Sequence, residues 1–164
     1  MMTACEHGFG PFCDAESRIL ILGSFPSVRS REQGFYYAHP QNRFWKVLAA
    51  LAGTDVPGTL EEKKRFLTRH HIALYDVIER CRSEGSSDSS ITDVQVTDLR
   101  PILQMSAVDG RIYVNGGKAA ELYDRYQLPR LEIEAIRLPS TSPANARFSL
   151  EDLIRIWESR IGKI

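Results

Sequence analysis

The 164-residue sequence has little cysteine, no surplus charge of either sign and no long apolar run. Its 21 basic residues balance its 21 acidic residues, so no overall positive field marks it as a nucleic-acid-binding protein. No apolar stretch approaches the roughly 20 residues that a membrane-spanning helix needs, so we expect no association with a membrane. Residues 1–7 lack the basic and apolar segments of a secretion signal. We therefore expect a soluble cytoplasmic protein.

The cysteines are Cys5, Cys13 and Cys81, and their odd number suits a reducing compartment. A metal site built from Cys5, His7 and Cys13 lacks a fourth ligand at a usual spacing. The sequence therefore predicts neither a metal ion nor an organic cofactor. Its length suits a single domain, 1–164, whose core is large enough to fold without cross-links.

Apolar runs and helix signals alternate along the chain. We expect buried strands over residues 19–22, 72–77, 111–115 and 133–138. Helices are expected from Asn42 to Gly53, from Thr59 to about 70, and over 97–105, 116–126 and 149–161, with a polar loop over 79–91. This alternation predicts an α/β fold, a three-layer α/β/α sandwich around a mostly parallel four-stranded central sheet.

The first predicted strand leads into a candidate binding pocket. Four consecutive aliphatic residues, 19–22, suit a strand that is buried on both faces, as strands of parallel sheets are. The turn Gly23-Ser-Phe-Pro-Ser27 ends this strand, and a loop rich in aromatic and hydrogen-bonding residues follows over 35–45. Ligands bind at the carboxyl ends of such strands. The turn lacks the glycine pattern and lysine of phosphate-binding loops, which disfavours a small-molecule nucleotide enzyme.

Two segments resemble motifs of the uracil-DNA glycosylase superfamily, and most closely its hypoxanthine-DNA (deoxyinosine) glycosylase branch. They are Gly23-Ser-Phe-Pro-Ser27 with Tyr36-Tyr-Ala-His-Pro-Gln-Asn-Arg-Phe-Trp45, and Leu138-Pro-Ser-Thr-Ser-Pro-Ala-Asn145. The resemblance implies a base-excision-repair enzyme that hydrolyses the N-glycosidic bond of deoxyinosine and releases hypoxanthine. Neither motif contains a lysine for Schiff-base chemistry, so strand cleavage is not expected. The implied partner is DNA containing a deaminated base, bound by a monomer.

The resemblance also implies roles for residues of the first motif. Tyr37 takes the place of the aromatic ring that stacks on the flipped base, and Gly23, Ser24 and Phe25 line the base pocket. Many superfamily members have Asp or Asn at the position of Phe25. The resemblance therefore implies Asn42 as the catalytic group that orients water, although Asn42 alternatively serves only as a helix cap.

The second motif and one strand end supply the other candidates. Asp76 lies at the end of the strand 72–77. When ionised, its carboxylate accepts hydrogen bonds and donates none, so it suits the N1–H of hypoxanthine, although an Asp here also caps turns. The residues assigned to DNA contact are His39, Ser140, Thr141, Ser142 and Asn145. His39 alternatively has a structural role. A local basic rim is expected from Arg29, Arg31, Arg43, Arg137 and Arg147.

Two other functions stay open. The first is a glycosylase for uracil or mismatched bases, which is disfavoured because Leu138 stands where uracil-specific members have a catalytic His. The second is a weakly catalytic module that binds DNA lesions, which the missing Asp or Asn at Phe25 favours. Release of free base in a single turnover separates catalysis from binding.

Overall fold

A parallel sheet forms the centre of the computed structural model, which describes residues 3–83 and 91–164. Its strand order is β3-β2-β6-β7, and its strands are β2 (Ile19–Gly23), β3 (Ile72–Asp76), β6 (Ile112–Asn115) and β7 (Ile136–Leu138). The central strand β2 sends Ile19 and Ile21 into one apolar core and Leu20 and Leu22 into another. The predicted four-stranded parallel sheet is therefore confirmed.

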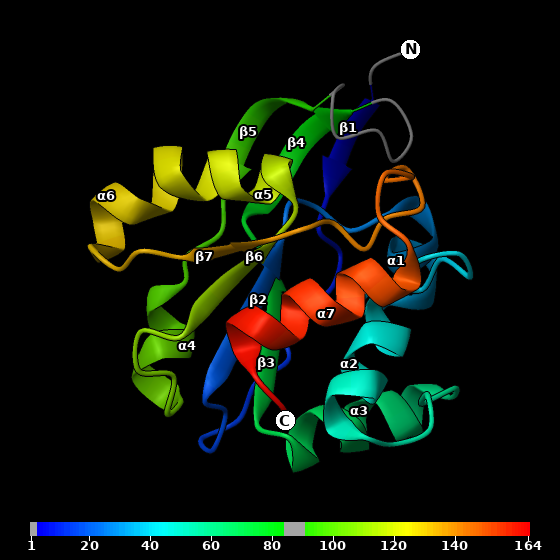
Figure 1. The fold of residues 1–164 in the computed structure, drawn as a ribbon. Coiled ribbons are helices and arrows are strands. Elements are labelled where there is room, and N and C mark those ends of the chain that lie inside the picture. The colour runs from blue at the N-terminus through cyan, green and yellow to red at the C-terminus, as the bar shows by residue number, and fades with distance from the viewer. Residues whose placement is uncertain (1–2, 84–90) are drawn as a thin grey trace.

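Helices cover both faces of this sheet (Figure 1). Their apolar residues place α2 (Phe44–Ala52), α3 (Leu60–Arg69) and α7 (Leu150–Ile161) on one face. The other face carries α4 (Arg100–Met105), α5 (Gly117–Leu122) and a π-helix (Tyr123–Gln127). Two short helices complete the fold, α1 (Val28–Gln33) after β2 and α6 (Leu128–Leu131) after the π-helix. The three-layer prediction is confirmed.

Capping side chains set several helix ends where the sequence predicts them. The Thr59 hydroxyl accepts a backbone N–H at the start of α3, and Ser149 forms a capping box with Asp152 at the start of α7. Helix α2 ends at Gly53, whose φ of 67° favours glycine. Two elements begin three residues later than predicted: β7 begins at Ile136 and α4 begins at Arg100.

A second sheet, which is antiparallel, was not predicted. It has the order β1-β4-β5 and consists of β1 (Thr3–Glu6), β4 (Ile78–Ser83) and β5 (Thr92–Val96). The prediction of a polar loop over 79–91 is therefore wrong for 79–83, while residues 84–90 lie outside the described residues. Pairing on both edges makes this segment a strand, although its exposed side chains are charged. Arg80 pairs with Glu6 at 3.1 Å across β1 and β4.

Within the described ranges, no helix has both the length and the apolar character needed to cross a membrane.

Candidate active site

The carboxyl ends of the parallel strands border a cavity of about 350 Å³. Strand register places Gly23 of β2 beside Asp76 of β3, and Asn115 of β6 beside Leu138 of β7. The loops that follow the strands complete the wall. The predicted site residues that line this cavity are Gly23, Ser24, Phe25, Tyr37, His39, Asn42, Asp76, Ser140, Thr141 and Ser142. Asn145 instead lines an adjoining groove.

Gly23 allows the Asp76 carboxylate to approach the backbone at the end of β2. A Cβ atom at position 23 would lie 2.4 Å from Asp76 Oδ1 and 3.1 Å from the Tyr37 hydroxyl oxygen. The first distance is far inside van der Waals contact, so only glycine leaves room for the carboxylate. Asp76 is 3% exposed, and its Oδ2 lies 2.7 Å from His7 Nε2. The base-binding candidate is thus a buried carboxylate with one oxygen already paired.

Aromatic rings form the wall beside this carboxylate. Tyr37 stacks on Phe44 with ring centroids 3.9 Å apart and planes at 17°, and its φ of 52° is unusual for a residue with a side chain. Because Phe44 covers one ring face, a base can stack only on the opposite face. Tyr36 is buried and donates to the Gly10 carbonyl at 2.8 Å. Burial, together with the nearby Asp76 charge, raises the pKa of the Tyr36 hydroxyl, which keeps it a donor.

Asn42 lines the cavity and also holds the start of α2. Its Oδ1 accepts the Phe44 N–H at 2.9 Å, although Arg43 takes the N-cap position itself. A carbonyl oxygen has two lone pairs, so this bond leaves one for a water molecule. The capping role and the predicted catalytic role are therefore compatible. His39 Nδ1 accepts the Gln41 N–H at 3.1 Å, which leaves the ring hydrogen on Nε2.

Arg43 was expected in a DNA-facing rim, and the structure instead directs its side-chain donors at the protein itself. Its guanidinium donates within the protein to three carbonyls of the loop after β7, those of Ser142 (2.9 Å), Asn145 (3.0 Å) and Phe148. Its backbone N–H also donates to the Thr141 carbonyl at 3.1 Å. Arg43 therefore joins the start of α2, beside Asn42, to this loop.

Thr141 and Asn115 form a second attachment of the same loop. Thr141 has no exposed surface, its Oγ1 accepts from Asn115 Nδ2 at 3.1 Å, and its N–H donates to Asn115 Oδ1 at 3.1 Å. The structure thus gives the Thr141 side chain an anchoring position, and its DNA contact stays a prediction. The sequence reasoning missed Asn115, although its place at the end of a predicted strand was a usable signal.

The serines of the loop have a different environment. The Ser140 hydroxyl accepts the Ser142 N–H at 3.1 Å, and the Ser142 hydroxyl accepts the Ala144 N–H at 3.2 Å. Each of these bonds uses an oxygen lone pair and leaves the hydroxyl hydrogen to donate. Asn145 Nδ2 donates to the Ser140 carbonyl at 3.0 Å, so its side chain helps to close the turn.

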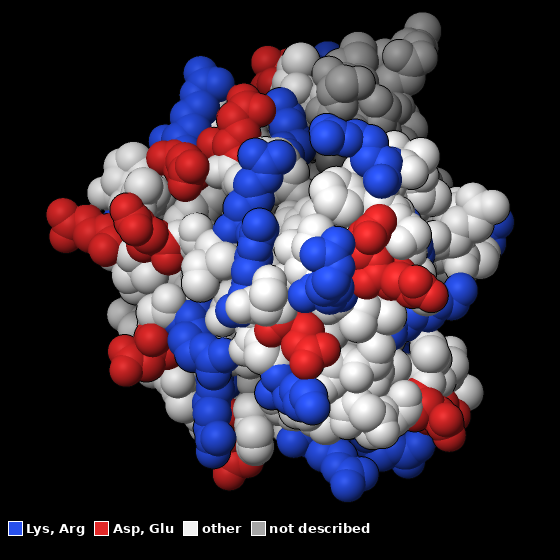
Figure 2. Space-filling view, in the orientation of Figure 1, with Lys and Arg blue, Asp and Glu red and all other residues white. Residues whose placement is uncertain are grey.

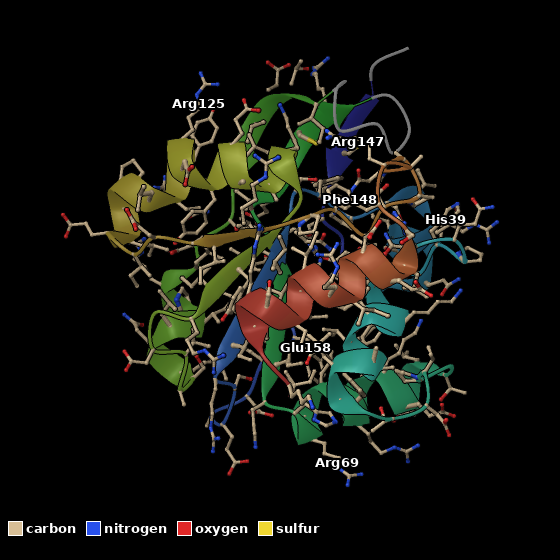
Figure 3. The ribbon with its side chains drawn as sticks, viewed as in Figure 1. His39, Arg69, Arg125, Arg147, Phe148 and Glu158 are labelled. Carbon is tan, nitrogen blue, oxygen red and sulfur yellow. The ribbon has the colours of Figure 1, made fainter. Side chains whose placement is uncertain are left out.

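A basic groove continues from the cavity across β7 and α7. It shares Ser140, Ser142 and Ala144 with the cavity and is bordered by Arg137, Arg147 and Arg160. Figure 2 shows that Lys and Arg side chains gather in a band over α5, β7 and the C-terminal end of α7. His39 and Arg147 lie on the same side of the molecule (Figure 3). The charge balance of the whole chain therefore conceals a local positive surface.

No three His, Cys, Asp or Glu side chains gather as a metal site would require in the part of the chain that the structure describes. The cavity instead offers amides, hydroxyls, aromatic rings and one carboxylate, next to an arginine-bordered groove. These groups are chemically complementary to a planar polar ring attached to an anionic chain.

Comparison with known proteins gives the family. The model of the uracil DNA glycosylase superfamily matches residues 10–159, so the chain belongs to that superfamily. It is 37% identical over 145 residues to a hypoxanthine DNA glycosylase of Methanosarcina acetivorans, covering 88% of this chain and 90% of that protein. A hypoxanthine DNA glycosylase of Methanosarcina barkeri is 33% identical over 143 residues, covering 87% and 89%.

A solved structure supports the fold assignment. The solution NMR structure of a Methanosarcina acetivorans protein described as a candidate uracil DNA glycosylase superposes with a TM-score of 0.79 at 34% sequence identity. The match covers 99% of this chain and 98% of that one. The arrangement of strands and helices described above is thus that of a known glycosylase-like protein.

Proposed function

We propose that this protein is a monofunctional DNA glycosylase that releases hypoxanthine from deoxyinosine in DNA and leaves an abasic site. The observation that carries this proposal is the buried Asp76 carboxylate at the wall of a cavity that Asn42 and Tyr37 also line. The identity to two hypoxanthine DNA glycosylases supports it.

Base recognition follows from hydrogen-bonding chemistry. An ionised carboxylate accepts hydrogen bonds and donates none. Hypoxanthine carries a hydrogen on N1, whereas adenine, from which it arises by deamination, has a lone pair there. Asp76 Oδ1 therefore attracts hypoxanthine and repels adenine, while Tyr37 stacks on the flipped ring. The backbone N–H of Phe25, which lines the cavity after Gly23, completes the site by holding the base carbonyl.

The hydrolytic step depends on position more than on basicity. An amide oxygen is too weak a base to remove a proton from water, but it orients water toward C1′ of the deoxyribose as the sugar becomes oxocarbenium-like. Asn42 fills this role in our proposal, and the attacking water gives up its proton to the departing base, which leaves as an anion. The Phe44 N–H fixes Asn42 Oδ1 in place, so little freedom is lost when a water molecule binds. His39 Nε2–H is available to donate to the departing base or to a phosphate.

The strand that carries the flipped nucleotide follows the basic groove. The Ser140 and Ser142 hydroxyls contact phosphates beside the cavity, and Arg137 and Arg147 neutralise phosphates farther along. The turn 143–145 lies between cavity and groove, where it fills the gap that the extruded base leaves in the stack.

Oligonucleotides that each carry one hypoxanthine, uracil, xanthine or mismatched thymine test this function. The protein is incubated in excess over each duplex, and alkali then cleaves any abasic site. We expect fastest cleavage at hypoxanthine and none before alkali. Cleavage without alkali contradicts a monofunctional enzyme, faster uracil release supports the pyrimidine-specific alternative, and binding without base release supports the lesion-binding module.

A further inference from the structure

His7 is a buried histidine that lies outside the two sequence motifs. It is 3% exposed and precedes the segment, residues 10–159, that matches the family model. Its Nε2 lies 2.7 Å from Asp76 Oδ2 across 69 positions of the chain. Asp76 is the residue to which base recognition is assigned above, so the partner of its second oxygen bears directly on specificity.

The antiparallel sheet holds His7 in this position. The His7 N–H donates to the Glu79 carbonyl at 2.8 Å, which continues the pairing of β1 with β4 beyond the end of β1. Glu79 lies on β4, three residues after Asp76. The backbone that carries the imidazole is therefore fixed to the chain segment that carries the carboxylate.

Aromatic rings surround the imidazole. The ring contacts Phe9 (centroids 4.5 Å apart), Tyr75 (5.0 Å), Tyr36 (5.9 Å) and Phe25 (6.2 Å). These rings come from four separate segments of the chain. His7 Nδ1 is buried and has no hydrogen-bond partner among the described residues. The ring thus makes one strong polar contact, and that contact is with Asp76.

This contact determines which oxygen of Asp76 serves the cavity. A carboxylate accepts only, so His7 Nε2 carries the hydrogen and occupies Oδ2. Oδ1 is the oxygen that approaches Gly23 at the cavity wall. Oδ2 therefore faces His7 and Oδ1 faces Gly23, and the carboxyl group cannot rotate without breaking a buried hydrogen bond.

We propose that His7 is a positioning residue for base recognition, which directs Asp76 Oδ1 toward the N1–H of the flipped base. This inference rests on the proposed function, since it names the residue that gives Asp76 its selectivity. His7 does not touch the base, and its effect passes through Asp76 alone. Loss of the His7 donor lets the carboxylate turn, and selectivity for a base with an N1 hydrogen falls.

The test compares His7→Leu, which removes the donor, with His7→Gln, whose amide N–H can replace it. Phe9→Leu is the matched control, because it disturbs packing around the imidazole and leaves the donor in place. Single-turnover excision is measured on hypoxanthine and on its 1-methyl analogue, which lacks the N1 hydrogen. We expect His7→Leu to lower hypoxanthine excision about 10-fold or more and to reduce the preference over the analogue. His7→Gln should recover part of the rate and part of the preference. Phe9→Leu should change neither the rate nor the preference more than about twofold, since the hydrogen bond between His7 and Asp76 persists.

A double mutant tests whether His7 acts through Asp76. His7→Leu should change excision and selectivity little when Asp76→Asn is already present. Imidazole ¹⁵N chemical shifts of the wild-type protein should show the hydrogen on Nε2, and melting curves verify that each variant folds. Additive losses in the double mutant, or equal losses in His7→Leu and Phe9→Leu, would overturn the inference. If the wild-type protein releases no hypoxanthine, the proposed function is wrong; if it does and His7→Leu retains full rate and preference, only the role of His7 is wrong.

Discussion

At the scale of single residues, Asn42 combines a helix-start hydrogen bond with a place on the cavity wall. Asn42→Ala should slow base excision by about 10²-fold while DNA affinity changes little, because the amide acts on water. Single-turnover rates and titrations with uncleaved DNA measure the two effects. Asn42→Asp is a useful second variant, because its carboxylate still accepts the Phe44 N–H and so keeps the hydrogen bond at the start of α2 while the amide is lost. Unchanged excision by a folded Asn42→Ala protein would remove Asn42 from the mechanism.

The site requires a residue without a side chain at position 23, because the Asp76 carboxylate lies against the Gly23 backbone. Gly23→Ala places a Cβ atom 2.4 Å from Asp76 Oδ1 and so forces the carboxylate away from the cavity wall. We expect hypoxanthine excision to fall on the order of 10²-fold, as for other misplaced recognition groups. Gly10→Ala is a matched control, because a Cβ atom there meets nothing within 4 Å. Equal activities of the two variants would show that the close approach of Asp76 to Gly23 does not affect hypoxanthine excision.

At the scale of structural elements, the loop after β7 depends on α2 for its shape. Arg43 donates to carbonyls along this loop, and lysine cannot reproduce a planar group with several donors. Arg43→Ala and Arg43→Lys should both speed amide hydrogen exchange in residues 142–148 and weaken DNA binding. Arg43→Ala should also lower the free energy of unfolding by about 2 kcal/mol, since three partly buried carbonyls lose a charged donor.

The control for this element is Arg125, an exposed arginine on the π-helix whose guanidinium lies over the Tyr126 ring (Figure 3). Arg125→Ala removes the same side chain without touching the loop. Its exchange pattern in residues 142–148 should match that of the wild-type protein. Faster exchange there in Arg125→Ala, or no change in Arg43→Ala, would contradict the role of Arg43 in holding this loop.

At the scale of the whole molecule, net neutrality limits how DNA is attracted. Because positive and negative residues are equal in number, we expect DNA binding to depend on the groove bordered by Arg137 and Arg147. Each Arg→Ala change there should weaken affinity for damaged and undamaged DNA alike and reduce the slope of log affinity against log salt by about 1. Arg69 lies at the other end of the molecule (Figure 3), so Arg69→Ala should leave the slope unchanged. A slope unaffected by Arg147→Ala would place the DNA elsewhere.

The parts of the molecule that the sequence predicts are those whose signals are local. Strand β2 is a run of aliphatic residues and α7 begins with a capping box, so both were predicted close to their observed bounds. Strand β4 alternates poorly and exposes charged side chains, so only its pairing with distant strands reveals it. The first motif indicated Asn42 and the end of a predicted strand indicated Asp76, and both line the same cavity. The contact of His7 with Asp76 joins segments 69 positions apart, and no local pattern records it.

The short connection between the two sheets has a consequence for how specificity can change. Strand β3 ends at Asp76 and β4 begins at Ile78, so one residue separates the parallel sheet from the antiparallel one. The Asp76 carboxylate, to which we assign base recognition in our proposal, therefore lies at the junction of two structural units. A laboratory selection for a broader range of excised bases should return substitutions in β1 and β4 as well as in the cavity wall. Sequencing the selected variants measures this. Substitutions confined to the cavity wall would show that β1 and β4 do not influence which bases are excised.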